Sequence, residues 1–365
     1  MSITTDLSLY FHFPFCVRKC NYCAFYSVPW ASEAQKDAYL DALKTQSLSF
    51  GEFRPVPSVY FGGGTPTNFG VSRLADLLAF IREHFSLTPD CEITLEANPA
   101  DVSPADLQTL REAGFNRLSI GMQTSDDALL KSLGRRHTFA DTLATVNAAR
   151  AAGFANLSLD LLFALPGQTL AGFTRSVRDA LSLSPEHISA YSLQLEEGTA
   201  FYQKRDALVF PTEDEEEAQY DALCALLADA GFRHYEISSF AKEGFRSRHN
   251  LRYWERGDYL GIGAAAHSFW NGKRFSNSPD LLAYLASPLT ANNYKAAERI
   301  DETEAWEESV MLGLRTDEGI PETLVSPEHV SRLVSLGLLT QKDGNIALTE
   351  RGWRVSNAVI GQLLL

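Results

Sequence analysis

The stretch LSLYFHFPFCVRKCNYCAFYS, residues 7–27, joins a predicted strand to three closely spaced cysteines. Aromatic and aliphatic residues dominate Leu7–Phe13, which is typical of a buried strand. Cys16, Cys20 and Cys23 follow as C-x3-C-x2-C, so three thiols share one short loop. Thiolates are preferred ligands of soft metal centres such as zinc and iron–sulfur clusters. The stretch therefore predicts a metal site at the end of the first strand, with zinc and a cluster both open.

The first strand begins a repeated strand-then-helix pattern. Further strands are expected at Ser58–Phe61, Glu92–Glu96, Arg117–Met122, Asn156–Phe163 and His187–Leu193. Helices are expected at Ala34–Leu48, Val71–His84, Pro104–Ala113, Leu170–Leu183 and, with an acidic first turn, from Glu213 to about Ala230. Because parallel neighbours need long crossovers, the pattern predicts a parallel sheet. We expect residues 1–240 to form an α/β fold, a partial (β/α)6 barrel whose strand ends carry the site.

Two further regions follow the predicted barrel. Residues 241–300 are rich in Gly, Asn, Ser and aromatic residues, which indicates a loop-rich connection with a functional role. Residues 301–365 predict a small winged-helix-like domain, with helices at Glu302–Arg315, Pro327–Leu336 and Gly352–Leu363 and a hairpin turning at Asp343-Gly344. Eleven acidic against five basic residues in this domain disfavour phosphate contact, so we expect it to act as a docking element or lid.

Composition excludes several classes of protein. The 365 residues carry 32 basic and 46 acidic side chains, a net charge of −14, which disfavours nucleic-acid partners. No apolar run is long enough for a transmembrane segment, and the first residues lack the pattern of a signal peptide. Five cysteines, three of them clustered, suit a metal site in a reducing compartment better than a disulfide framework. We therefore expect a cytoplasmic protein.

Polar and glycine-rich residues stand at the ends of several predicted strands. Residues 62–67, GGGTPT, leave bare backbone that can approach a ligand closely, without the Gly-Lys-Ser/Thr of a phosphate-binding loop. Glu96, Gln123 and Asp160 each lie near the end of a different strand, and Arg135 lies on a connection. A carboxylate can bind an ammonium group or ribose hydroxyls, and an arginine can bind a carboxylate through two hydrogen bonds. These positions predict one polar ligand site above the sheet.

The cysteine loop, with Tyr22 just before its third cysteine, resembles the signature of the radical S-adenosylmethionine (SAM) proteins. The resemblance implies a [4Fe-4S] cluster held by Cys16, Cys20 and Cys23, SAM bound to the fourth iron, and a reductant that supplies electrons. The strand-end residues resemble the SAM-contacting set of the coproporphyrinogen dehydrogenase-like branch: Tyr10, Gly63, Gly64, Thr65, Glu96, Gln123, Arg135, Asp160 and Gln194. Gln194 departs from the small residue expected there.

Within that branch the sequence is similar to the HemW heme chaperones. Coproporphyrinogen III dehydrogenases carry a further cysteine where this chain has Phe25, whereas DLLFALPGQT, HN-x2-YW and YLGIGAAAHS match the chaperones. The resemblance implies heme binding, and a histidine among aromatic residues can ligate heme iron while the rings pack on the porphyrin. The candidate heme residues are His249, Asn250, Tyr253 and Trp254 of the HN-x2-YW motif, together with His267.

Three hypotheses follow from these motifs. The first is a heme chaperone that binds heme, a [4Fe-4S] cluster and SAM and transfers heme to acceptor proteins that the sequence does not identify. The second is a radical-SAM oxidoreductase acting on coproporphyrinogen III or another tetrapyrrole. The third is a zinc-stabilised interaction protein, in which His12 would supply the fourth ligand; it leaves the polar strand ends unexplained.

Overall fold

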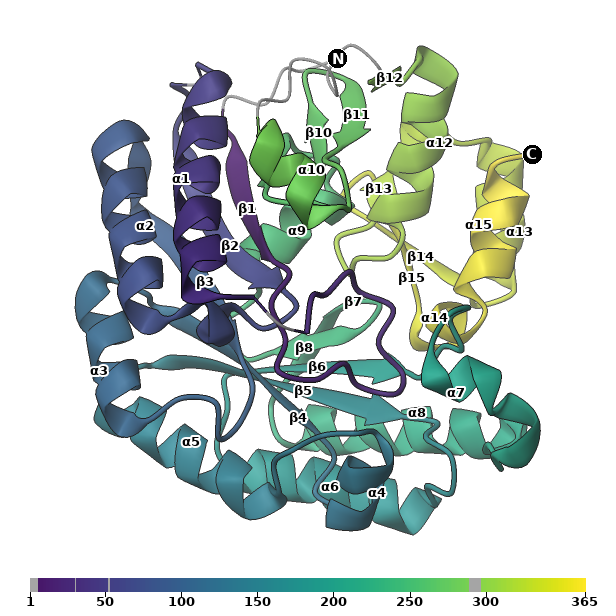
Figure 1. Cartoon of the computed structure of the whole chain (residues 1–365). Coiled ribbons are helices and arrows are strands. Elements are labelled where there is room, and N and C mark those ends of the chain that lie inside the picture. The colour runs from purple at the N-terminus through teal and green to yellow at the C-terminus, as the bar shows by residue number, and fades with distance from the viewer. Residues whose placement is uncertain (1–5, 30, 52, 289–296) are drawn as a thin grey trace.

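The main body of the protein is one twelve-stranded sheet that curves into an open barrel (Figure 1). The structure is a computed structural model, and it describes residues 6–29, 31–51, 53–288 and 297–365. The strands run in the order β12-β11-β10-β9-β1-β2-β3-β4-β5-β6-β8-β7. Six parallel neighbours form its centre: β1 (Ser8–Phe13), β2 (Val56–Gly63), β3 (Leu87–Ala97), β4 (Arg117–Gln123), β5 (Asn156–Phe163) and β6 (His187–Ser192). The prediction of an α/β partial barrel is confirmed.

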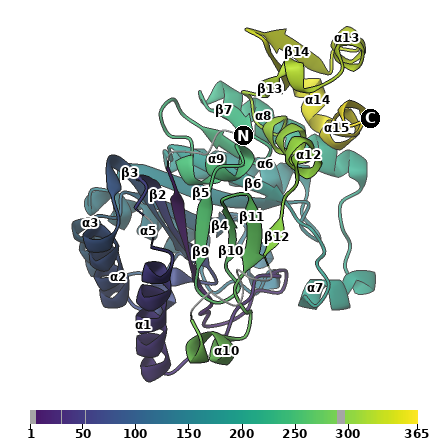
Figure 2. The same ribbon diagram turned by 90° about the horizontal axis from the view of Figure 1, so that it is seen from above.

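Helices connect the parallel strands and cover the outer face of the sheet, as two perpendicular views show (Figures 1 and 2). The longer ones are α1 (Glu33–Ser49), α2 (Val71–His84), α3 (Pro104–Ala113), α5 (Phe139–Ala151), α6 (Leu170–Ser182) and α8 (Glu213–Asp229), and the shorter ones are α4 (Asp127–Ser132) and α7 (Ala200–Gln203). Several begin with a side-chain cap. Ser32, Ser103 and Thr138 each form a reciprocal capping box, which satisfies the free N–H groups of the first turn.

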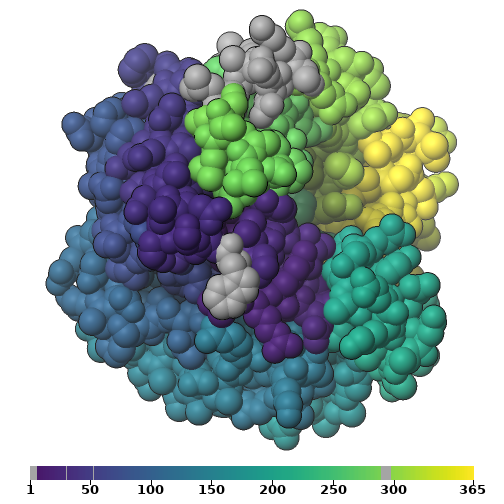
Figure 3. Space-filling view, viewed as in Figure 1, coloured from purple at the N-terminus to yellow at the C-terminus, as the bar shows by residue number. Residues whose placement is uncertain are grey.

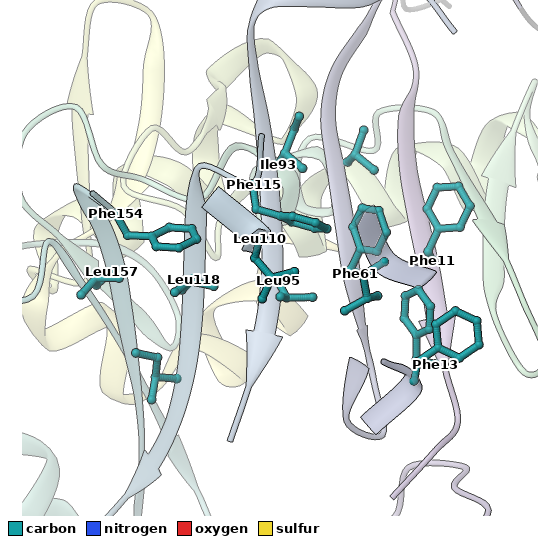
Figure 4. Close-up of a cluster of buried hydrophobic side chains, with 14 of the residues drawn as sticks. Phe11, Phe13, Phe61, Ile93, Leu95, Leu110, Phe115, Leu118, Phe154 and Leu157 are labelled. Atoms are coloured by element: carbon teal, nitrogen blue, oxygen red, sulfur yellow. The ribbon is translucent and has the colours of Figure 1, made fainter. Parts of the chain in front are cut away.

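The two faces of each strand differ in chemistry, and this alternation fixes which side is enclosed. Phe11, Phe61, Leu95 and Leu118 point outward and pack between sheet and helices with no exposed surface (Figure 4). Residues at the alternate positions face the inside of the barrel and are largely polar. Successive side chains of a strand point to opposite faces, so one set builds the core and the other lines the interior.

The region expected to be a loop-rich connection contains regular structure. Its described part holds β8 (Ser239–Ala241), α9 (Arg248–Trp254), β9 (Tyr259–Ile262), β10 (His267–Trp270), β11 (Lys273–Ser276), α10 (Leu281–Ala286) and β12 (Glu298–Arg299). Strand β9 pairs in parallel with β1, and β10 to β12 continue the sheet in antiparallel fashion. With β7 (Arg233–Glu236), β8 forms the opposite edge. Strands of two to four residues are too short to show a clear hydrophobic period, so the sequence pattern indicated loops. Part of the predicted connection, residues 289–296, lies outside the described residues.

The C-terminal residues form a separate domain with its own core. It comprises α12 (Glu302–Gly313), β13 (Ile320–Pro321), α13 (Pro327–Ser335), β14 (Leu339–Lys342), β15 (Asn345–Leu348), α14 (Glu350–Arg354) and α15 (Ser356–Leu363). The predicted hairpin turns at Asp343-Gly344, both with positive φ. The single final helix predicted over Gly352–Leu363 is wrong: Val355, at φ −121°, separates α14 from α15. No helix among the described residues is long and apolar enough to span a membrane.

Phe61 tests the aromatic packing under the helices. Its ring lies 4.9 Å from that of Phe115 and 5.4 Å from that of Phe11. We expect Phe61→Ala to lower the free energy of unfolding by about 3–5 kcal/mol, because it removes transfer energy and leaves a cavity. The matched control is Phe53→Ala at an 82% exposed position, which should change it by less than about 0.5 kcal/mol. Equal losses in chemical denaturation would contradict this description of the core.

Candidate functional site

The three clustered cysteines lie on a loop that is held over the open end of the barrel. The loop leaves β1 at Phe13, and backbone hydrogen bonds between Cys16 and Val28 and between Val28 and Pro14 close its base. Its far side is attached to the end of α4, where the Asn21 Nδ2 donates to the carbonyl of Ser132 at 2.7 Å. The N-terminal segment therefore covers the middle of this face of the molecule (Figure 3).

A cavity of about 430 Å³ extends from this loop into the barrel. This size is typical of small-molecule sites. Many of the predicted site residues line it: Cys16, Cys20, Cys23, Gly63, Gly64, Thr65, Glu96, Gln123, Arg135, Asp160 and Asn250. Side chains from five parallel strands and the cysteine loop thus meet around one space, as the pattern of polar strand ends predicts.

Two glycines let the β2 end approach the cysteine loop. Gly63 has φ +110°, and a Cβ there would lie 2.6 Å from the His12 ring. A Cβ on Gly64 would lie 2.9 Å from the Phe13 carbonyl oxygen and 3.0 Å from the Cys16 Sγ. Contacts this short exclude any side chain, so the glycine run is required by backbone conformation and by close packing.

A chain of polar contacts connects the strand ends to the thiols. Asn98, just after β3, donates to the Thr65 Oγ1 at 3.0 Å, and Thr65 lies 3.6 Å from the Cys16 Sγ. Arg135 donates to the Asn98 Oδ1 at 2.6 Å, to the Gly121 carbonyl at 2.7 Å and towards the Cys20 Sγ at 3.7 Å. Arg135 therefore joins the β4 end and Asn98 to the cysteine loop.

The thiols suit the cluster that the sequence predicts. All three line the cavity and are only partly buried, and burial raises the pKa of Cys16 and Cys23, so metal binding would release their protons. In the described part of the chain, no three His, Cys, Asp or Glu side chains converge on a single metal ion. Three thiolates around an open cavity fit a cluster that takes one thiolate per iron and leaves one iron for a small ligand.

Two partly buried carboxyl groups dominate the electrostatics of the cavity. Glu96 accepts hydrogen bonds from the Tyr60 hydroxyl at 2.8 Å and from the Gly63 N–H at 3.1 Å, and Asp160 accepts from the Ser119 hydroxyl at 3.0 and 3.1 Å. Burial raises the pKa of Glu96 to about 7 and that of Asp160 to about 6. Both groups therefore titrate near neutral pH, where a bound cation or hydroxyl group would favour their charged forms.

The cavity also contains residues that the sequence analysis missed: Tyr60, Asn98, Arg117, Ser119, Ser189, Tyr191 and Glu196. On β4, the lining residues are Arg117, Ser119, Gly121 and Gln123, which is every second position. The polar side chains at alternate positions of this buried strand were the sequence signal that could have identified these lining residues.

Two predicted SAM contacts lie outside this lining. Gln194 is exposed, and Tyr10 lies under the cavity, where its hydroxyl contacts the His12 Nδ1 at 3.0 Å.

The HN-x2-YW motif lies on helix α9 and not, as expected, in a loop. Glu92 accepts from the N–H groups of Arg248 and His249, both at 3.1 Å, and so caps the start of this helix. His249 is 1% exposed and stacks on Tyr60 at 5.0 Å. Its Nδ1 contacts the Ser58 hydroxyl at 2.9 Å and its Nε2 contacts the Tyr253 hydroxyl at 2.8 Å, so neither nitrogen is free to ligate iron in this conformation.

The other candidate heme residues have different surroundings. Asn250 follows His249 on α9 and lines the cavity, which connects the motif to the predicted SAM site. Tyr253 and Trp254 are half-buried. His267, at the start of β10, is exposed and is close enough to His12 for the two imidazoles to interact electrostatically.

The raised pKa of Glu96 can be tested through the pH dependence of stability. Its pKa of about 7 in the folded protein exceeds the ordinary value of 4.5, so the folded state binds more protons between these values and stability falls as pH rises from 4.5 through 7. We expect Glu96→Gln in the ligand-free protein to remove a loss of the order of 3 kcal/mol between pH 5 and pH 8. Urea denaturation at both pH values measures it. The exposed Glu112→Gln is the control, and an unchanged pH dependence in Glu96→Gln would contradict the prediction.

Comparisons with known proteins agree with this geometry. Residues 10–180 match the model of the radical SAM superfamily, and residues 300–355 match that of the HemN C-terminal domain. The heme chaperone HemW of Lactococcus lactis is 36% identical over 98% of this chain and 97% of its own length, and that of Bacillus subtilis is 36% identical over 98% and 99%. The bovine radical S-adenosyl methionine domain-containing protein 1, a mitochondrial protein, is 35% identical over 95% of this chain and 75% of its own.

A solved structure shares the whole fold. Coproporphyrinogen III oxidase (HemN) from Escherichia coli, a radical SAM enzyme, superposes with a TM-score of 0.84 over 98% of this chain and 90% of that chain, at 23% identity. At that identity the likeness shows the fold, and the assignment to a family rests on the sequence matches. The matches extend from the cysteine loop to the C-terminal domain, and the chain belongs to the HemW family of radical-SAM proteins.

Proposed function

We propose that the protein is a heme chaperone that binds heme, a [4Fe-4S] cluster and SAM, and passes heme to acceptor proteins in the cytoplasm. The observation that carries the proposal is the match along 98% of the chain to proteins named heme chaperone HemW. The match includes the HN-x2-YW helix and the C-terminal domain, both of which lie outside the region common to radical-SAM proteins in general.

The cysteine loop and the cavity support the cofactor part of the proposal. Cys16, Cys20 and Cys23 would hold the cluster, which supplies an electron to SAM when an external reductant has charged it. Arg135 lies beside the Cys20 thiol and has no carboxylate partner among the described residues, so we expect it to contact SAM bound at the cluster. Glu96 and Asp160 are placed to accept hydrogen bonds from hydroxyl or ammonium groups of SAM.

For heme, we assign two different roles to the candidate residues. His267 is exposed, so its imidazole is the one that we propose as an iron ligand. His249 would act through position: its hydrogen bond to Ser58 attaches α9 to β2, its contact with Tyr253 fixes the ring within α9, and Asn250 is thereby held at the cavity. The proposed link between heme and SAM is therefore this helix.

A second candidate function is a radical-SAM oxidoreductase acting on a tetrapyrrole. It is favoured by one observation, that Glu96, Gln123, Arg135 and Asp160 all face the cavity as a site for SAM would need. Formation of 5′-deoxyadenosine that depends on added coproporphyrinogen III would support it.

Heme titration of the anaerobically prepared protein tests the proposal. We expect a Soret band that saturates, and we expect His267→Ala to shift that band and weaken heme binding at least about tenfold by removing the ligand. His249→Ala should leave the band position unchanged. Absence of heme binding would contradict the chaperone proposal, and a band shift in His249→Ala alone would overturn the assignment of His267.

A further inference from the structure

The floor of the cavity contains a cation without a partner. Arg117, the first residue of β4, lines the cavity and is 1% exposed. Its Nε has no hydrogen-bond partner, and the guanidinium group forms no ion pair within the described residues. Burying a charge without a paired or hydrogen-bonded partner is costly, so such a group in a cavity indicates a ligand that completes it.

A second polar group beside Arg117 is also unsatisfied. Thr94 on β3 is opposite Arg117 in the parallel register and has no exposed surface. It shares the inward face with Glu96, two positions further on, and its Oγ1 has no hydrogen-bond partner. Arg117 in the cavity lining and Thr94 buried beside it in the register are therefore two neighbouring orphan groups, and they point to one missing acceptor between strands β3 and β4.

The acidic residues of the cavity do not fill this role. The Glu96 oxygens accept from Tyr60 and the Gly63 N–H, and the Asp160 oxygens accept from Ser119. Arg117 acts on both carboxyl groups electrostatically, without a direct contact. The fork of its guanidinium group is therefore left for an anion that enters the cavity.

We propose that Arg117 forms a carboxylate-binding site at the floor of the cavity. The planar guanidinium group binds a carboxylate through two parallel hydrogen bonds, and Thr94 can donate a third. Two molecules in the proposed function carry carboxylates, SAM through its methionine part and a tetrapyrrole through its propionates. The choice of these two sources rests on the proposed function, whereas the site rests on the orphan groups alone.

Paired probes with and without a carboxylate distinguish the sources. SAM is compared with 5′-methylthioadenosine by anaerobic calorimetry, and coproporphyrin III is compared with its tetramethyl ester by fluorescence. The variants are Arg117→Met, which removes the charge, and Arg117→Lys, which keeps it without the fork. Arg111→Met, at an arginine of α3 that donates to the Gly153 carbonyl outside the barrel, is the matched control.

We expect Arg117→Met to weaken one carboxylate-bearing probe about ten- to a hundredfold and to leave its carboxylate-free analogue unchanged. Arg117→Lys should lie between the wild type and Arg117→Met. The melting temperature of ligand-free Arg117→Met should not fall, because the change removes an unpaired buried charge. If Arg117 had only a structural role, Arg117→Met would instead lower the melting temperature.

Two results would overturn the proposal: equal binding of all probes by Arg117→Met and wild type, or a lower melting temperature with equal losses for both members of each pair. If Arg117→Met does not fold, Arg117→Lys decides by the same comparison. Failure of the proposed function is separable, since it shows as absent heme binding while the Arg117 effect on SAM or on coproporphyrin III persists.

Discussion

The cost of burying charge inside a sheet is the constraint on which this structure depends. The outward face of the barrel is a continuous apolar core, whereas the inward face contains the buried Arg117 and the partly buried Glu96 and Asp160. Such groups destabilise a fold unless they are paired or bind something. The aromatic and aliphatic packing under the helices supplies the stability that permits this polar interior. The cavity is therefore a region in which the protein gives up stability for binding.

The cysteine loop and helix α9 enclose this interior from two sides. The loop carries the thiols at the open end, and α9 packs against the inner residues of β1 and β2 through the His249 ring. Asn250 extends from α9 to the cavity wall. In the proposed function, the HN-x2-YW helix and the SAM site would thus share one set of contacts. This gives a physical route by which the state of one site can affect the other.

Much of the fold could be predicted because its signals were local. The six parallel strands and their helices follow from hydrophobic period and caps, and the prediction of an α/β barrel with a small C-terminal domain is confirmed. The short strands β9 to β12 could not be recognised, since pairing with β1 and with each other depends on distant backbone groups.

In the candidate site, the glycine and cysteine motifs identified the cysteine loop and the end of β2 from the sequence. Arg117 and Tyr60 were missed because a single polar residue within a strand carries little signal until the inward face is known. The hydrogen bond between His249 and Ser58 could not be foreseen, because Ser58 belongs to a strand that is distant in the sequence.

We expect Cys16, Cys20 and Cys23 to hold a cluster with one iron open to SAM in this cavity. Mössbauer spectra of the anaerobic protein reconstituted with ⁵⁷Fe, recorded before and after adding SAM, test it directly. The expected result is a [4Fe-4S] spectrum in which SAM changes the signal of one iron. This spectrum should be present in Cys91→Ala and Cys224→Ala and lost when any one of the three loop cysteines is replaced by Ala. A colourless protein that binds zinc, or a cluster that does not respond to SAM, would contradict it.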